Sequence, residues 1–194
     1  MPPRAMIQTP FEAAVGFVLA AEGVLSDDPG DPGGLTKYGH DQASWPATLA
    51  RLPADVRSTM PTHVALLTRA QAIVAYDWAY WRWAHCDLLP PPVALLVFDA
   101  TVNGGSPVVW LQHAVGAETD GVLGPDTLRA LTAKVATGGG AAVLAEFQAW
   151  HLAYLASLPT WRRFGADNGR PLGWVRRAFS MCFATMQMPM EAHA

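Results

Sequence analysis

The sequence has little cysteine and no spacing typical of a metal site. Its two cysteines, Cys86 and Cys182, lie far apart, and its six histidines are scattered. We therefore expect no metal and no cofactor, because tight metal sites need ligands at short, defined spacings. We expect both thiols to be free, with a disulfide as the alternative.

Charge is also scarce. Only 15% of residues are charged, and the formal net charge is −3. The basic residues cluster only at Arg162-Arg163 and Arg176-Arg177, so the sequence lacks the positive footprint of a nucleic-acid-binding protein. We expect no nucleic-acid partner.

Long hydrophobic runs and a leader are missing as well. No apolar run approaches the ~18 residues of a spanning helix, so we expect no stable membrane insertion. The start, Met1-Pro2-Pro3-Arg4, has no apolar core followed by a small-residue cleavage site. We expect synthesis in the host cytoplasm, with release to the periplasm or cell wall through a holin-type route.

Apolar residues and tryptophan are abundant instead. In 194 residues, 51% are apolar and eight are Trp. This length fits one domain with a sizeable core, and two lobes around a cleft are the alternative arrangement. Trp can build such a core, and it can also stack on sugar rings.

The first helix is signalled by Thr9-Pro10-Phe11-Glu12, a capping box with proline at the first helical position. Gly and Pro between positions 29 and 39 exclude helix and favour turns with a small β-hairpin, its strand at 35–38. Thr68-Arg69-Ala70-Gln71 is a second capping box. The other expected helices follow caps, prolines and apolar spacing: 69–84, 90–103, 108–115, 125–136, 141–158 and 171–186. The class is mainly α, with one small β element near the front.

Glu22 is the strongest catalytic candidate. It continues the apolar stripe of the first helix after Val15 and Val18, where lost hydration would raise the pKa of a carboxyl. A general acid near neutral pH requires such a shift. The alternative is a glutamate that frays into water at the helix end. Asp27, Asp28 and Asp31 follow in the loop, where aspartate commonly forms turns.

Asp99 and Asn103 are two polar residues on an otherwise apolar helix. They are four positions apart and so share one face. Buried polar side chains need partners. The sequence leaves two interpretations open, a structural hydrogen-bond pair and a place in a substrate groove.

The stretch Glu22-Gly23-Val24, followed by Asp28-Pro29-Gly30-Asp31-Pro32-Gly33-Gly34-Leu35-Thr36-Lys37-Tyr38-Gly39, resembles the family 108 glycoside hydrolases. It departs from the family pattern at Val24 and at His40, where an apolar residue is usual. Residues 98–105, 110–112 and 120–128 look like the peptidoglycan-binding segment of that family. The resemblance implies one lysozyme-like α+β domain over 1–194, with a helical lobe and a small β-hairpin lobe flanking a groove. Residues 8–89 would carry the catalytic motif and 90–187 the binding segment.

The resemblance also implies an activity, that of an N-acetylmuramidase of the endolysin type acting on peptidoglycan glycan strands. Glu22 would be the general acid, Asp31 would stabilise positive charge or act as base, and Thr36 would position water. We assign substrate binding to Tyr38, Asp99 and Asn103, and we expect a monomer. A lytic transglycosylase that uses Glu22 alone and a non-catalytic wall-binding protein are the alternatives. An amidase would need a zinc site that we do not find.

Overall fold

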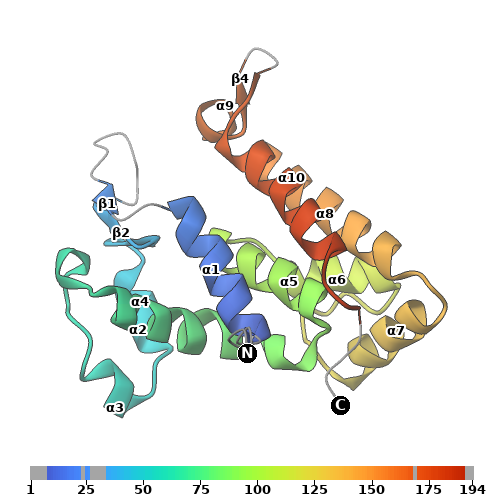
Figure 1. The fold of residues 1–194 in the computed structure, drawn as a ribbon, viewed down its shortest axis with the longest axis horizontal. Coiled ribbons are helices and arrows are strands. Elements are labelled where there is room, and N and C mark those ends of the chain that lie inside the picture. Colours follow the sequence, from blue (N-terminus) through green and yellow to red (C-terminus); the bar gives the residue numbers. More distant parts are fainter. Residues whose placement is uncertain (1–7, 23–24, 27–33, 168–169, 191–194) are drawn as a thin grey trace, which may run out of the picture. The chain divides into compact units, whose positions relative to one another are not determined.

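The computed structural model describes residues 8–22, 25–26, 34–167 and 170–190, with the side chains of Ala21, Glu22, Ser26 and Arg170 left undescribed. The protein is mostly helical, with two small antiparallel sheets (Figure 1). The chain divides into two compact units, Met1–Trp83 and Ala84–Ala194. Among the described helices, none combines the length and the apolar character that crossing a membrane requires.

Unit 1 contains short helices and a three-stranded sheet. Its elements are, in chain order, α1 (Pro10–Glu22), β1 (Leu25–Ser26), β2 (Thr36–Lys37), β3 (His40–Asp41), α2 (Trp45–Ala50), α3 (Ala54–Arg57), η1 (Val64–Leu66), α4 (Arg69–Tyr76) and the π-helical η2 (Asp77–Arg82). Both predicted capping boxes are present. Thr9 and Glu12 exchange hydrogen bonds of 2.8 and 3.2 Å, and Thr68 and Gln71 exchange bonds of 3.0 and 3.2 Å.

The core of unit 1 lies beside the sheet and includes Trp45, Val64, Leu67, Ala72 and Ala75, all buried. Half-buried apolar side chains pack against it, among them those of Leu35 and Tyr38 from the sheet region. The sheet is therefore anchored by side-chain packing, since strands of two residues offer few ladder hydrogen bonds.

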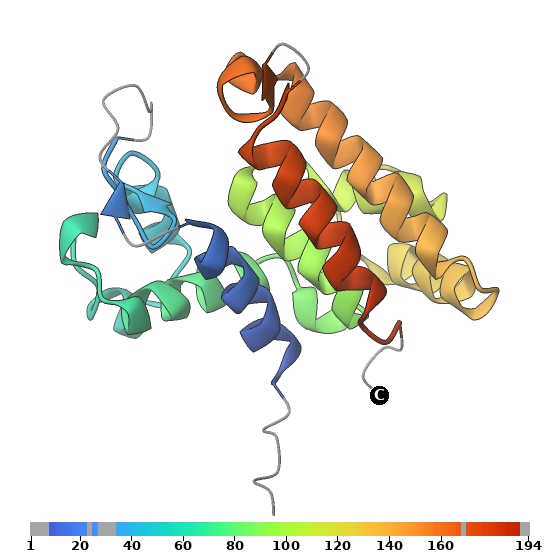
Figure 2. The same ribbon diagram turned by 45° about the horizontal axis from the view of Figure 1, so that its top comes forward.

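Unit 2 is built around one apolar helix. Its elements are η3 (Cys86–Leu88), α5 (Pro91–Asn103), α6 (Pro107–Val115), α7 (Pro125–Ala136), α8 (Gly140–Ser157), α9 (Trp161–Phe164), β4 (Ala166–Asp167), β5 (Arg170–Pro171) and α10 (Gly173–Met186). Every residue of α5 from Pro91 to Ala100 is buried, as expected for a helix that is apolar all round. Helices α6, α8 and α10 pack against α5, and α8 and α10 run antiparallel, side by side (Figure 1, Figure 2).

Most predicted helices are confirmed, and three details of the prediction are wrong. The helix expected over 69–84 changes to π-helix at Asp77. The strand expected at 35–38 covers only Thr36–Lys37, because Tyr38 lies in the following turn with a φ of +51°. A second β-hairpin, β4–β5, lies near the end of the chain, where we predicted only a loop. The two cysteines are free thiols, as predicted.

Candidate active site

Glu22 is the last residue of α1, four residues after the fully buried Val18. Residues on a helix that are four apart share a face, so Glu22 is on the same face of α1 as Val18. The side chain of Glu22 is not described, and Asp31 lies outside the described residues. The roles assigned to these two carboxylates therefore remain predictions.

Thr36 lies in the central strand of the three-stranded sheet. It pairs with Ser26 on β1 and with Asp41 on β3. Ser26 follows Glu22 by only four residues, which span at most about 14 Å when extended. The register thus tethers Thr36 near the end of α1. The Thr36 hydroxyl donates to the Gly34 carbonyl at 3.3 Å, which leaves its lone pairs able to accept hydrogen bonds.

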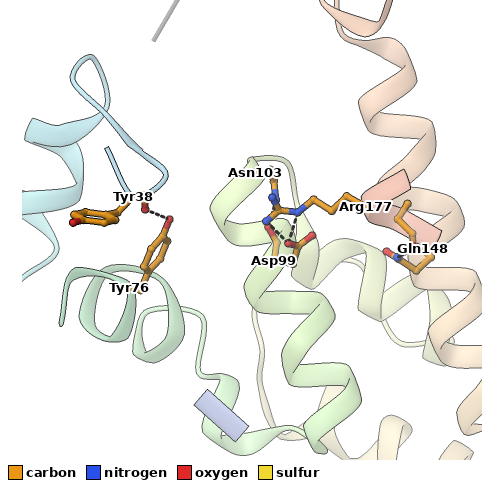
Figure 3. Close-up of polar contacts among 7 residues, drawn as sticks. Tyr38, Tyr76, Asp99, Asn103, Gln148 and Arg177 are labelled. Atoms are coloured by element: carbon orange, nitrogen blue, oxygen red, sulfur yellow. Dashed lines mark hydrogen bonds and ion pairs between the residues drawn. The ribbon is translucent and has the colours of Figure 1, made fainter. Parts of the chain in front are cut away.

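Tyr38 and Gly39 form the two-residue turn between β2 and β3. Their φ angles are +51° and +81°, which is the type I′ pattern that suits a tight hairpin. A bulky residue with positive φ is strained and needs support from its surroundings. That support is the Tyr76 hydroxyl, which donates to the Tyr38 carbonyl at 2.9 Å (Figure 3). The Tyr38 ring packs against the unit 1 core and is half-buried.

His40 lies beneath this turn and is only 2% exposed. Three aromatic rings surround it, those of Trp45, Tyr76 and Tyr80, with centroids 5.2, 4.3 and 6.0 Å away. Its Nε2 lies 3.3 Å from the Ala72 carbonyl, and Nδ1 has no partner among the described residues. Burial lowers the pKa of His40 to about 4, because the charged imidazolium is disfavoured there.

The sequence did not single out His40 or Tyr76 as supports of the motif. His40 stood out only as a polar residue at a position where the family usually has an apolar one. The structure explains the exchange, since a neutral imidazole ring fills an aromatic pocket. Tyr76 and Tyr80 are four residues apart, and that helical spacing was the available signal for a shared face beneath the hairpin.

Asp99 and Asn103 lie together in unit 2. The Asp99 carboxylate, 2% exposed, accepts from Arg177 Nε at 2.9 Å and from Arg177 Nη2 at 2.6 Å (Figure 3). Asn103 Nδ2 donates to the Asp99 carbonyl at 2.7 Å. These contacts favour the structural alternative for Asp99, because its carboxylate holds α10 to α5. A substrate role for the two residues stays a prediction.

A small cavity adjoins this ion pair, lined by Asp99, Asn103, Trp174, Arg177 and the buried His151, among others. Its volume of about 10 Å³ is close to the minimum for one water molecule and far below that of a sugar ring. This cavity is therefore too small to hold a sugar ring beside Asp99.

Gln112 organises the part of the chain that resembles a peptidoglycan-binding segment. It is 1% exposed, and its Nε2 lies within 2.6–3.1 Å of Asp120 Oδ1, the Val122 carbonyl and Thr127 Oγ1. Its Oε1 accepts from the Gly121 amide at 2.9 Å. The Val122 amide and the Gln112 side chain both donate to Asp120 and lower the pKa of its carboxyl. The motif thus fixes a turn through its own polar groups.

The sequence model of the glycosyl hydrolase 108 family matches residues 15–105. Over this stretch, which is just under half of the chain, the sequence is similar to that family. The glycosyl hydrolase 108 stretch spans Glu22, Thr36, Tyr38, Asp99 and Asn103 and ends before the Gln112 turn. The family match therefore does not include the Gln112 region, and it gives no support to the prediction that this region binds peptidoglycan.

A solved structure extends the likeness to nearly the whole chain. The Brucella abortus protein SagA is 28% identical, with a TM-score of 0.72, over 94% of this chain and 97% of that one. No relative was found among curated proteins. The glycosyl hydrolase 108 match and the SagA likeness together support a mainly α lysozyme-like fold and a glycoside hydrolase that acts on peptidoglycan.

Proposed function

We propose that this peptidoglycan hydrolase is an N-acetylmuramidase with Glu22 as its general acid. It hydrolyses the β-1,4 bond between N-acetylmuramic acid and N-acetylglucosamine. The observation that carries the proposal is the chain path in the family-matched stretch: α1 ends at Glu22, and the next strand pairs with the strand of Thr36. We further propose an endolysin role, which rests on the family resemblance of residues 22–39.

The chemistry requires a proton donor for the leaving oxygen and a group facing the oxocarbenium-like centre. Glu22 supplies the proton in this proposal, and Asp31 supplies the second carboxylate. Thr36 positions the attacking water through its free lone pairs, since its proton is directed at the Gly34 carbonyl. The Tyr76–Tyr38 hydrogen bond and the buried His40 hold the strand that carries Thr36.

The first experiment compares Glu22→Gln with Glu12→Gln, the same isosteric change on the same helix. Glu12 is exposed and caps α1, and glutamine can keep that cap. Clearing of permeabilised Gram-negative cells should fall by about 10²–10⁴-fold in Glu22→Gln and remain near wild type in Glu12→Gln. Equal clearing by all three proteins would refute Glu22 as the acid. No clearing by any of them, the wild type included, would favour a non-catalytic wall-binding protein.

Product analysis separates hydrolysis from lytic transglycosylation. We expect digested peptidoglycan to carry new reducing N-acetylmuramic acid ends, whereas 1,6-anhydro ends would identify a transglycosylase. Asp31→Asn and Asp28→Asn then test the second carboxylate. Asp31→Asn should reduce turnover strongly and Asp28→Asn weakly, because only Asp31 is assigned to the reacting sugar. The reverse order would move that role to Asp28.

A further inference from the structure

Arginine is concentrated near the end of the chain. Residues 160–177 contain five arginines and one acidic residue, Asp167, whereas residues 84–159 contain two basic and six acidic residues. In the sequence the cationic positions form two separate pairs, Arg162-Arg163 and Arg176-Arg177. The fold of unit 2 brings these two pairs to the same end of the α8–α10 helix pair (Figure 1, Figure 2).

An aromatic cluster holds the two pairs together. Trp174 on α10 packs against Trp161 and Phe164 on α9, with centroids 6.4 and 5.4 Å away. Gly165 lies against the Trp161 indole so closely that a Cβ there would come within 2.0 Å of the ring. The Leu172 amide also donates to the Gly165 carbonyl at 2.8 Å. The α9–β4–β5 segment is thus packed onto the start of α10.

Three of the described arginines at this end are exposed, Arg162 and Arg163 on α9 and Arg176 on α10. The Arg163 guanidinium lies over the Phe164 ring, 5.1 Å from its centroid. Arg177, by contrast, is directed inward to Asp99. We call Arg162 and Arg176 the arginine tip. Each guanidinium is planar and presents parallel N–H donors, which match the two oxygens of a carboxylate.

Peptidoglycan has two parts that a hydrolase can recognise, the glycan strand and the peptide stems. The glycan strand supplies the bond to be cleaved, and the peptide stems attached to it carry free carboxylates. We propose that the arginine tip binds the carboxylates of the peptide stems, as a contact separate from the Glu22–Thr36 motif. This inference rests on peptidoglycan being the substrate. The tip lies outside the family-matched stretch of 15–105, so the motif that defines the family does not include it.

The test measures binding to purified Gram-negative sacculi in a Glu22→Gln background, so that cleavage does not release the protein. The test variant is Arg162→Gln with Arg176→Gln. The control variant, Arg57→Gln with Arg69→Gln, removes two charges from exposed positions of unit 1, and thermal unfolding verifies that each variant is folded. At low salt the tip variant should bind roughly 3- to 10-fold more weakly than the parent, while the control should match it. The difference in binding between the tip variant and its parent should shrink at 1 M salt, because the Debye length falls to about 3 Å and the attraction between charges is screened.

A second arm identifies the ligand. Sacculi whose stems have been removed by an amidase keep the glycan and lose the peptide carboxylates. On that material the tip variant and its parent should bind equally. The proposal is overturned if the tip variant binds intact sacculi as well as its parent does. It is also overturned if the difference persists on stripped glycan, or appears only on walls that carry phosphate polymers.

The muramidase proposal and the arginine-tip proposal can be refuted independently of each other. If the wild type releases no new chain ends but stem-dependent binding is lost in the tip variant, the proposed muramidase activity is wrong and the tip proposal stands. If the wild type cleaves sacculi but the tip variant binds like its parent, only the tip proposal is wrong.

Discussion

At the scale of single residues, the Tyr76 hydroxyl is one of the contacts that link the catalytic motif to the rest of unit 1. It donates to the carbonyl of Tyr38, a residue with positive φ, at 2.9 Å. The turn supported in this way connects the strand of Thr36 to the strand of the buried His40. A single hydroxyl 38 residues away therefore helps to fix the geometry of the motif.

Tyr76→Phe removes this hydrogen bond and keeps the ring in its aromatic cluster. Its matched control is Tyr80→Phe, which removes the bond between Tyr80 Oη and Thr48 Oγ1 (3.0 Å) without touching the hairpin. Both changes should lower the free energy of unfolding by about 1 kcal/mol. Only Tyr76→Phe should also lower kcat on peptidoglycan, because it alone loosens the Thr36 hairpin. Equal kcat values for the two variants would contradict a positioning role for Tyr76.

At the scale of elements, α5 and α10 are joined by the buried Asp99–Arg177 pair, and α8 and α10 by Gln148, which donates to the Ala178 carbonyl at 3.1 Å (Figure 3). The Asp99 side chain is 3% exposed and the Arg177 side chain 13%. Removing one partner of such a pair leaves a buried charge without its counter-ion, which costs more than the pair itself contributes.

Asp99→Ala should therefore lower the free energy of unfolding by about 3 kcal/mol in urea titrations. Asp99→Leu combined with Arg177→Met should recover most of that loss, because it removes both charges together. Activity per folded molecule should remain near wild type in the double variant. If activity falls while stability is retained, the substrate role predicted for Asp99 from the sequence is correct and the structural role is secondary.

Element boundaries show what local sequence can predict. The capping boxes at Thr9 and Thr68 join residues three apart, so the sequence contains both partners of each bond and both helix starts were predicted correctly. The hairpin at 166–171 was missed. It lies between α9 and α10, which pack together through Trp174 and the aromatic rings of α9, and local residue spacing does not reveal this packing. The π-helical turn at Asp77 was missed as well, since residue spacing alone does not distinguish it from α-helix.

At the scale of the whole molecule, each compact unit has, among its described residues, one buried histidine with a lowered pKa. Burial lowers the pKa of His40 in unit 1 to about 4 and also lowers that of His151 in unit 2. His151 is 5% exposed and stacks on Trp110 at 5.2 Å, with Asp99 and Arg177 nearby. Both units should therefore respond to acid in the same direction.

The direction of the pH effect on stability follows from the number of protons that the folded and unfolded chains bind. An unfolded chain protonates histidine near pH 6.5, whereas folded His40 protonates only near pH 4. Between these values the unfolded chain holds more protons, so stability decreases as the pH falls through this window and is fully present above it. For His40 the loss amounts to about 3 kcal/mol.

The measurement is the urea midpoint at pH 7.5, 6 and 5. We expect a steady decrease in the wild type and a smaller decrease in His40→Phe, which keeps an aromatic ring and removes the titrating group. His85→Asn serves as the control, because His85 is exposed and has positive φ, a conformation that asparagine accepts. The same pH slope in wild type and His40→Phe would rule out His40 as the source.

The sequence by itself determined the features whose partners are close in the chain: the capped helix that ends at Glu22, the presence of a small β-hairpin around Thr36, and the apolar helix α5. Only the tertiary structure decided that Arg177 pairs with Asp99, 78 residues away, that Tyr76 supports Tyr38, and that two arginine pairs share one end of unit 2. The physical reason is that hydrogen bonds across one turn depend on local geometry, which residue order specifies. Long-range contacts depend instead on how helices pack and on which side chains become buried, and residue spacing does not encode that arrangement.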